Sequence, residues 1–205
     1  KLSGQSFGEF LRTRLFAPLG MKDTAFHCPH DKIGRFTSCY QPKQGGGIKI
    51  QDDAQSSTYA EPPKLESGGG GLVSSAHDYL RFCRMLLNGG TLDGVQILSP
   101  KTVEMFSLNL LPDGKLLTDM TAGPGIFSEA GYGGVGFSIG CGVNMDLSKS
   151  RLPGSQGEFF WGGAAATAFW IDPKEDLTVV FMTQVMGSDA RLTLRRDLRT
   201  LVYSA

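Results

Sequence analysis

The strongest constraint on the fold of this chain lies between residues 159 and 184. Residues 159–161 are aromatic, Gly162 and Gly163 follow, and residues 169–171 are again aromatic or β-branched. A second apolar run, 177–184, comes after the turn-forming sequence Asp-Pro-Lys-Glu-Asp. Aromatic and β-branched residues favour strands, and a turn between two such runs predicts a β-hairpin.

Two glycines inside a predicted strand mark a bulge or a place where another group approaches the backbone. Trp161 beside them offers a flat apolar wall, and the Ala164 N–H lies just beyond. An N–H on such a strand can stabilise the oxygen of an acyl group. Tight packing in a core strand explains the same residues, so both interpretations stay open at this point.

Composition excludes several classes of function. The chain has 205 residues, of which 40% are hydrophobic, and 20 basic side chains balance 20 acidic ones. This length is sufficient for one sizeable core or two small ones. Zero formal charge gives no electrostatic reason to expect a nucleic acid or an anionic membrane as partner. No apolar run approaches the ~20 residues of a membrane helix, and no signal peptide is visible.

The four cysteines are widely spaced and form no CxxC pair, so we expect reduced, buried thiols. The compartment is left undetermined, with the cytoplasm favoured over the periplasm. We predict no cofactor and no metal site. The cluster His27-Cys28-Pro29-His30 lacks a second pair of ligands nearby in the sequence, and His77 is most simply a residue in the first turn of a helix.

Four helices are predicted from capping residues and apolar spacing. Ser6 and Glu9 form a capping box, Ser75 opens a second helix, and Ser99 with Pro100 opens a third. Ser188-Asp189 caps a fourth, final helix. The side chains expected on their buried faces are Phe7, Phe10, Leu11 and Leu15, then Tyr79, Cys83, Leu86 and Leu87, then Val103, Phe106 and Leu110, and finally Leu194, Leu198, Leu201 and Val202.

The order of elements predicts an α+β fold. Residues 137–145 alternate as a strand, so three antiparallel strands are expected after the helices and before the C-terminal covering helix. We predict a helical region with long loops over residues 1–125. Antiparallel strands and the last helix are expected over residues 126–205.

Two short motifs match well-known patterns by chance. Residues 4–8 read G-x-S-x-G, but a nucleophile elbow needs a strand before it, and the cap explains Ser6. Residues 131–136 read G-x-G-x-x-G, but a dinucleotide site needs a helix after the motif, whereas an alternating strand pattern follows.

Several blocks together resemble the C-terminal half of the serine β-lactamase-like superfamily, and most closely the family VIII carboxylesterases, which are relatives of class C β-lactamases. The blocks are residues 17–24 (APLGMKDT), 67–74 (SGGGGLVS), 78–82 (DYLRF), 97–103 (ILSPKTV) and the Trp161-Gly162-Gly163 hairpin. The resemblance covers nearly the whole chain, in order. It implies that this chain is part of a β-lactamase-like fold.

The family's nucleophile and base are absent from this sequence. The family uses a Ser-x-x-Lys motif and a Tyr-x-Asn or related motif, both upstream of the block that begins here at Ser3. No serine here has Lys three positions on, and no tyrosine has Asn two positions on. The resemblance places Trp161-Gly162-Gly163 at the substrate-binding Lys-Thr-Gly position. It makes the Ala164 N–H one of two oxyanion-hole donors, the other being the N–H of the missing serine.

The resemblance implies a serine esterase that works through an acyl-enzyme, in which this chain alone is inactive. Trp161 and Gly162 provide neither a charge nor a hydroxyl for an anionic substrate, which favours neutral esters over β-lactams. The expected partners are a small ester and the missing N-terminal half, in cis or as another chain, and a homo-oligomer is left open. The alternatives are a fragment of a β-lactamase or penicillin-binding-type peptidase, and a non-catalytic binding or structural module.

Overall fold

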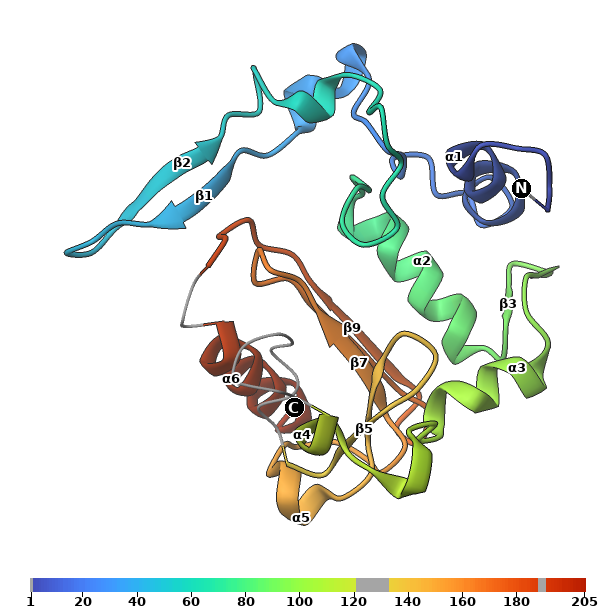
Figure 1. Ribbon diagram of the computed structural model, residues 1–205. Coiled ribbons are helices and arrows are strands. Elements are labelled where there is room, and N and C mark those ends of the chain that lie inside the picture. Colours follow the sequence, from blue (N-terminus) through green and yellow to red (C-terminus); the bar gives the residue numbers. More distant parts are fainter. Residues whose placement is uncertain (1, 121–132, 188–190) are drawn as a thin grey trace.

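The computed structural model describes residues 2–120, 133–187 and 191–205. Its centre is an antiparallel sheet in which neighbours in the chain are neighbours in space (Figure 1). The five strands are β5 (Val135–Phe137), β6 (Gly142–Asn144), β7 (Phe159–Gly162), β8 (Ala168–Asp172) and β9 (Leu177–Phe181). This sheet and the helices around it confirm the predicted α+β class.

The sheet has five strands where the sequence predicted three, because two expected strands each contain a turn. Residues 137–145 were expected as one strand, but Gly140, at φ 72°, lies in the turn that joins β5 to β6. The run from residue 159 to 171 breaks after Gly162, and the chain returns as β8. Small residues in the middle of an aromatic run therefore marked a turn rather than a bulged strand.

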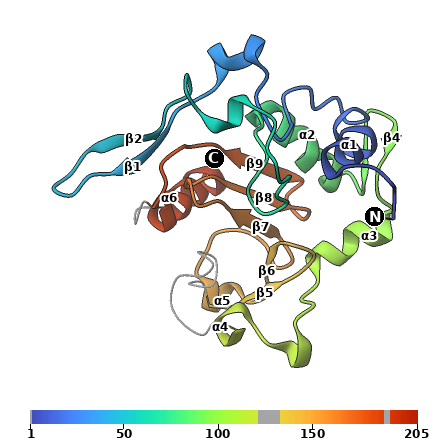
Figure 2. The ribbon, with the colours of Figure 1, turned by 45° about the horizontal axis from the view of Figure 1, so that its top comes forward.

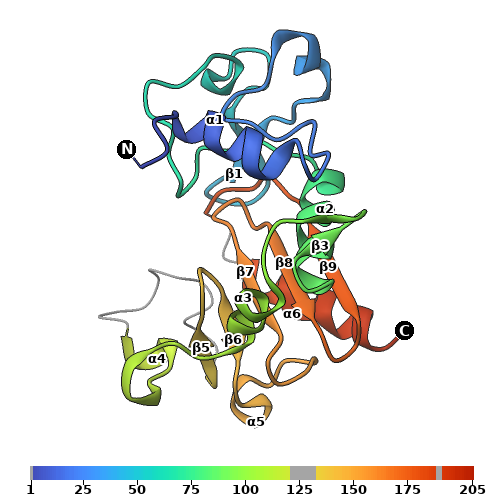
Figure 3. The ribbon, with the colours of Figure 1, turned by 90° about the vertical axis from the view of Figure 1, so that its right-hand side faces the viewer.

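Helices cover both faces of the sheet. Helix α2 (Ala76–Leu87) packs on β8 and β9 from one side, and α6 (Arg191–Tyr203) lies on the other (Figures 1 and 3). Successive residues of a strand point to opposite faces. Accordingly, Phe159 and Ile171 enter the core under α2, whereas Phe160 and Trp170 enter the core under α6.

The core under α2 is the larger of the two. Its buried members are Phe16, Leu19, Met21, Cys83, Met85, Leu86, Leu92, Val103, Phe106, Cys141, Phe159 and Ile171. The core under α6 consists of Leu117, Val135, Leu152, Phe160 and Trp170, with Phe137, Trp161, Leu198 and Val202 packed against it. The apolar stripes predicted for the second and third helices are largely confirmed, but Leu110 is 47% exposed.

Three of the predicted serine N-caps are confirmed, and the fourth, at Ser188-Asp189, lies outside the described residues. The hydroxyl of Ser6 accepts from the Glu9 N–H at the start of α1 (Phe7–Leu11), which continues as a π-helical turn (Arg12–Phe16). Ser75 caps α2, and Ser99 caps α3 (Pro100–Glu104). The second half of the predicted capping box is wrong, because the Glu9 carboxylate pairs with Arg12 at 2.8 Å.

A long hairpin projects from the body of the molecule (Figures 1 and 2). It consists of β1 (Cys39–Pro42) and β2 (Ile48–Asp52). Its base is held by Tyr40, whose N–H donates to Gln184 O at 2.8 Å and whose carbonyl accepts from Met186 N at 2.7 Å. The remaining short elements are β3 (Thr91–Leu92), β4 (Val95–Gln96), α4 (Leu117–Met120), α5 (Leu147–Ser150) and 3-10 turns at His30–Arg35, Thr58–Ala60, Met105–Ser107 and Pro112–Gly114.

Two further predictions fall wholly or partly on residues that the structure does not describe. The boundary proposed after residue 125 lies outside the described part of the chain, and so do residues 131 and 132 of the G-x-G-x-x-G match. The rest of that match leads into β5 and not into a helix. Among the described residues, no helix combines the length and apolar character needed to cross a bilayer.

The face of α6 that lies on the sheet differs from the predicted one. Leu194 and Leu201 were expected to be buried but are 42% and 69% exposed. Arg195 and Arg199 are instead each only 4% exposed, while Leu198 and Val202 pack on the core as predicted. The prediction failed because it followed apolar spacing alone, whereas acceptors under the helix take both guanidinium groups.

Arg199 lies in a buried polar network. Its Nη1 donates to Glu158 Oε1 at 2.7 Å and to Pro153 O at 3.2 Å, and Glu158 is fully buried. The Tyr203 hydroxyl lies 3.1 Å from Glu158 Oε2 and 2.9 Å from Asp172 Oδ2. Burial raises the pKa of Glu158, although Arg199 opposes the shift. The network fixes the last turn of α6, from Arg199 to Tyr203, on the sheet.

Replacing Glu158 by Ala should destabilise the chain strongly. The change leaves the Arg199 guanidinium buried without its carboxylate, which typically costs about 3–5 kcal/mol. Urea unfolding followed by tryptophan fluorescence measures the loss. Glu104→Ala, which removes an exposed carboxylate paired with Lys101, should leave the unfolding midpoint nearly unchanged. Equal effects of the two substitutions would contradict the role given to Arg199.

Candidate active site

The four predicted site residues are consecutive and lie where β7 ends. Trp161 and Gly162 are the last residues of β7, and Gly163 and Ala164 lead into the turn before β8. The Gly163 N–H donates to Thr167 O at 3.0 Å, and the Ala166 N–H donates to Gly163 O at 3.1 Å. Residues 164–166 therefore form a three-residue hairpin loop.

Three carbonyl groups of this loop are held by other parts of the chain. The Nη2 of Arg195 donates to Gly163 O at 3.0 Å and to Thr167 O at 2.7 Å. Ala165 O accepts from the Thr183 hydroxyl at 2.6 Å and from the Val185 N–H at 3.2 Å. Side chains and backbone from α6 and from the segment after β9 thus restrain a loop that would otherwise be free to move.

The Ala164 N–H remains available on this restrained loop. Ala164 is exposed, and no hydrogen bond to its N–H is formed within the described residues. An unpaired N–H is ordinary at the tip of a tight turn. What distinguishes this loop is that its carbonyl groups are anchored on both sides of Ala164. A fixed N–H donor is the kind of group that can stabilise developing negative charge.

Side chains of the protein itself fill the space beside the two glycines. A Cβ at Gly162 would overlap the guanidinium of Arg195, and a Cβ at Gly163 would overlap the Thr167 hydroxyl. The predicted close approach is therefore present, but the approaching groups belong to this chain. The bare face at Gly162 is filled from the α6 side.

Trp161 is half-buried and packs at the border of the core under α6. Its ring lies edge-on to that of Phe137, with centroids 5.5 Å apart and an interplanar angle of 70°. The indole therefore has a packing role, and part of its surface stays accessible. Its predicted contact with a substrate stays a prediction.

Sequence reasoning missed Arg195. A signal for it was present, because residues 192, 195, 198, 199 and 202 recur at the spacing of one helical face. Two arginines four residues apart interrupt an apolar stripe there. This pattern can indicate buried acceptors beneath the helix, but it is read as a solvated edge when the tertiary structure is not known.

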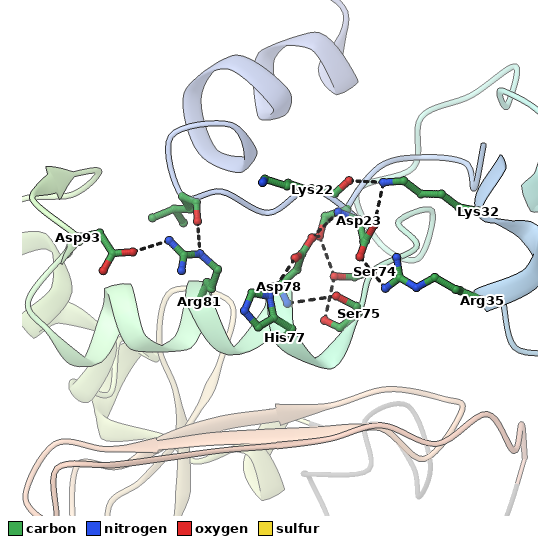
Figure 4. A network of polar contacts seen from close by, with 12 residues as sticks. Lys22, Asp23, Lys32, Arg35, Ser74, Ser75, His77, Asp78, Arg81 and Asp93 are labelled. Carbon is green, nitrogen blue, oxygen red and sulfur yellow. Dashed lines mark hydrogen bonds and ion pairs between the residues drawn. The ribbon is translucent and has the colours of Figure 1, made fainter. Parts of the chain in front are cut away.

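A cavity of about 110 Å³ lies elsewhere, and none of its lining residues comes from β7 or the loop after it. It is lined by Lys22, Asp23, Ala25, His27, Cys28, Pro29, Lys32, Arg35, Phe36, Val73, Ser74 and Ser75. Asp23 accepts from Lys32 at 2.7 Å and from Arg35 at 2.8 Å (Figure 4). These two cations lower the pKa of Asp23 to about 2.

Asp78 joins this cluster to α2. Its buried carboxylate accepts from the Asp23 N–H at 2.7 Å (Figure 4). It also accepts from the Thr24 hydroxyl at 2.9 Å. The cluster thereby attaches residues 22–35 to the first turn of α2. His77 is exposed in that turn, 3.6 Å from Asp78, as its predicted position suggested. Within the described ranges, no group of three His, Cys, Asp or Glu is placed to hold a metal ion.

The four cysteines are free thiols, as predicted, and three of them are buried. Burial raises the pKa of Cys83 and of Cys141 to about 12. Both thiols are protonated at neutral pH, so neither supplies a thiolate nucleophile.

The structure and the sequence together define the class of protein. A family model described as Beta-lactamase matches residues 1–204, and the chain therefore belongs to that family, within the serine β-lactamase-like superfamily. An uncharacterized protein of Mycobacterium tuberculosis is 34% identical over 179 residues, which are 86% of this chain and 43% of that protein. The chain thus spans less than half the length of this curated relative.

Solved structures share the fold at low sequence identity. Simvastatin synthase (LovD) from Aspergillus terreus aligns with 98% of this chain and 51% of its own, at a TM-score of 0.78 and 20% identity. EstCE1, a hydrolase with promiscuous acyltransferase activity, aligns with 98% of this chain and 52% of its own, at 0.75 and 21%. A β-lactamase from Mycobacterium bovis aligns with 98% and 57%, at 0.60 and 19%.

The ion cluster around Asp23 should make stability depend on acid pH. The pKa of the Asp23 carboxyl is lower in the folded chain than in the unfolded one. Its contribution to the free energy of unfolding is therefore present above pH 3.8 and is lost as pH falls toward 2. The contribution is no more than roughly 2 kcal/mol, since the carboxylate is 23% exposed and partly screened by water. Urea midpoints measured from pH 5 to pH 2 should fall less steeply in Asp23→Asn than in the native chain. Asp31→Asn, at an exposed aspartate, is the control, and an unchanged slope in Asp23→Asn would contradict the assignment.

Proposed function

We propose that this chain is the C-terminal part of a serine hydrolase that resembles family VIII carboxylesterases and cleaves carboxylic esters through an acyl-enzyme. The observation that carries the proposal is the restrained 164–166 loop, with an available Ala164 N–H directly after Trp161-Gly162-Gly163. Family membership supports the reaction class. The choice of a carboxylic ester as substrate is more specific than the reaction class and rests on the Trp161-Gly162-Gly163 triplet.

In this proposal the nucleophile comes from the half of the fold that is not in this sequence. A serine hydroxyl adds to the ester carbonyl and passes its proton to a base. The former carbonyl oxygen then carries the negative charge. The Ala164 N–H then donates to that oxygen together with the serine's own N–H. The alkoxide leaves as an alcohol, and water releases the carboxylic acid and restores the serine.

The chemistry of the triplet supports a neutral substrate. A Lys or a hydroxyl residue in that position would attract a carboxylate. Trp161 offers a partly accessible apolar ring instead, and the Cβ space of Gly162 is already filled by the Arg195 guanidinium. The accessible part of the indole favours contact with an uncharged acyl or alcohol group.

Hydrolysis of p-nitrophenyl butyrate tests the reaction class. We expect no turnover by this chain alone, because it has no Ser-x-x-Lys motif. The protein that carries this segment together with its preceding half should turn the ester over, with a burst of p-nitrophenol that reports the acyl-enzyme. Replacing the serine of its Ser-x-x-Lys motif by Ala should abolish the burst.

Other outcomes of this experiment would overturn the ester proposal. If the protein that carries this segment and its preceding half has no Ser-x-x-Lys motif and does not turn the ester over, the chain is a non-catalytic binding or structural module. Measurement of the size of the chain in solution would then show whether it is a dimer or aggregates. Faster turnover of nitrocefin than of the ester would favour a β-lactamase or penicillin-binding-type peptidase.

Trp161→Lys should shift selectivity toward anionic substrates. A new charge-assisted hydrogen bond to a substrate carboxylate is worth about 1.5–3 kcal/mol, or roughly tenfold or more in relative kcat/KM. The measurement compares a neutral p-nitrophenyl ester with one that carries a carboxylate, in the extended protein. Trp161→Phe retains an aromatic ring beside Phe137 and should keep the neutral preference. Unchanged selectivity in Trp161→Lys would remove Trp161 from the substrate site.

A further inference from the structure

We propose that Arg195 is a positioning residue for the oxyanion-hole donor, and this inference rests on the proposed function. Its guanidinium spans the loop, since Nη2 donates to the carbonyl oxygens of Gly163 and Thr167 at 3.0 and 2.7 Å. Hydrogen bonds from a charged donor are roughly twice as strong as those between neutral groups. The two ends of the loop are therefore held together by one buried cation.

The Gly163 carbonyl and the Ala164 N–H belong to the same peptide unit. That unit is planar and trans, so its C=O and N–H point in opposite directions. When Arg195 fixes the direction of the Gly163 carbonyl, it also fixes the direction of the Ala164 N–H, which points away from the guanidinium. A cation on the carbonyl oxygen further polarises the peptide unit and makes the N–H a stronger donor.

The glycine at position 162 is part of this arrangement. The guanidinium lies so close to the Gly162 Cα that any Cβ there would overlap it. The middle residue of the Trp-Gly-Gly triplet is thus needed for the approach of Arg195 to the loop. Arg195 is 4% exposed, so its position is set by packing and not by solvent.

The position of Arg195 is set in turn by the next turn of α6. Arg199, four residues later on the same helical face, is held by the buried Glu158 carboxylate at 2.7 Å. A helix fixed at Arg199 places Arg195 one turn away with little freedom. Helix α6 therefore connects the buried Arg199–Glu158 ion pair to the loop that carries Ala164.

Kinetics of Arg195 variants test this role in the protein that carries both halves of the fold. Arg195→Met should lower kcat for p-nitrophenyl butyrate by about 10- to 100-fold, less than the loss of an oxyanion donor itself, with KM changed less than about threefold. Arg195→Lys keeps the charge but not the planar guanidinium with its several N–H donors, and its kcat should lie between those of Arg195→Met and the native protein. Arg196→Met is the matched control, because Arg196 is the exposed neighbour on the same helix, and it should leave kcat within about twofold.

A spectroscopic measurement keeps the test independent of activity. In the ¹⁵N-labelled chain, the amide proton resonance of Ala164 should move upfield in Arg195→Met and less so in Arg195→Lys, while amide resonances of β9 stay in place. If Arg195→Met does not fold, Arg195→Lys carries both measurements. A kcat that falls only in proportion to the folded fraction, or an unmoved Ala164 resonance, would overturn the positioning role. If the native protein turns over no ester, the proposed function fails, and the Ala164 resonance still reports whether Arg195 orients this peptide unit.

Discussion

Two arginines buried under α6 decide how the C-terminal half of this molecule is held together. Removing a guanidinium from water is costly unless acceptors replace the lost hydration. Arg199 finds a carboxylate and a carbonyl oxygen under the helix, and Arg195 finds two carbonyl oxygens. Apolar contacts alone would allow α6 to slide or rotate on the sheet, because they are not directional. The charged groups remove that freedom, since each must meet its own acceptors.

This constraint reaches the loop between β7 and β8. Its carbonyl groups are held by α6 on one side and by the segment after β9 on the other. The Tyr40 bridge attaches the base of the β1–β2 hairpin to that same segment. The proposed site is therefore built where four separate parts of the chain meet at one end of the interior strands β7 and β8. Restraint of this kind is what an oxyanion-hole donor requires, because a donor that must reorganise during the reaction stabilises the transition state less.

Much of this organisation could be predicted from the sequence. The serine caps, the stripes of α2 and α3, the antiparallel strands, the covering helix and the family all follow from local patterns or from blocks of residues. The predicted site residues are consecutive, so the sequence necessarily placed them together. The number of strands and the buried face of α6 were wrong for a common reason. Both depend on contacts between residues far apart in the sequence. The turn that contains Ala166, at φ 65°, and the approach of Arg195 to Gly162 become visible only in the folded structure.

The sequence by itself determined the capped helices and the apolar runs that form the central sheet, and it determined that no nucleophile or base of the family pattern is present. These properties depend on spacing and on the chemistry of single residues. Only the tertiary structure decided that Gly162 makes room for a guanidinium, that Arg195 and Arg199 are buried, and that the Gly163–Ala164 peptide unit is held in one orientation. The physical reason is that a buried charge is stable only with its acceptors around it, and those acceptors lie 28 to 46 residues away along the chain.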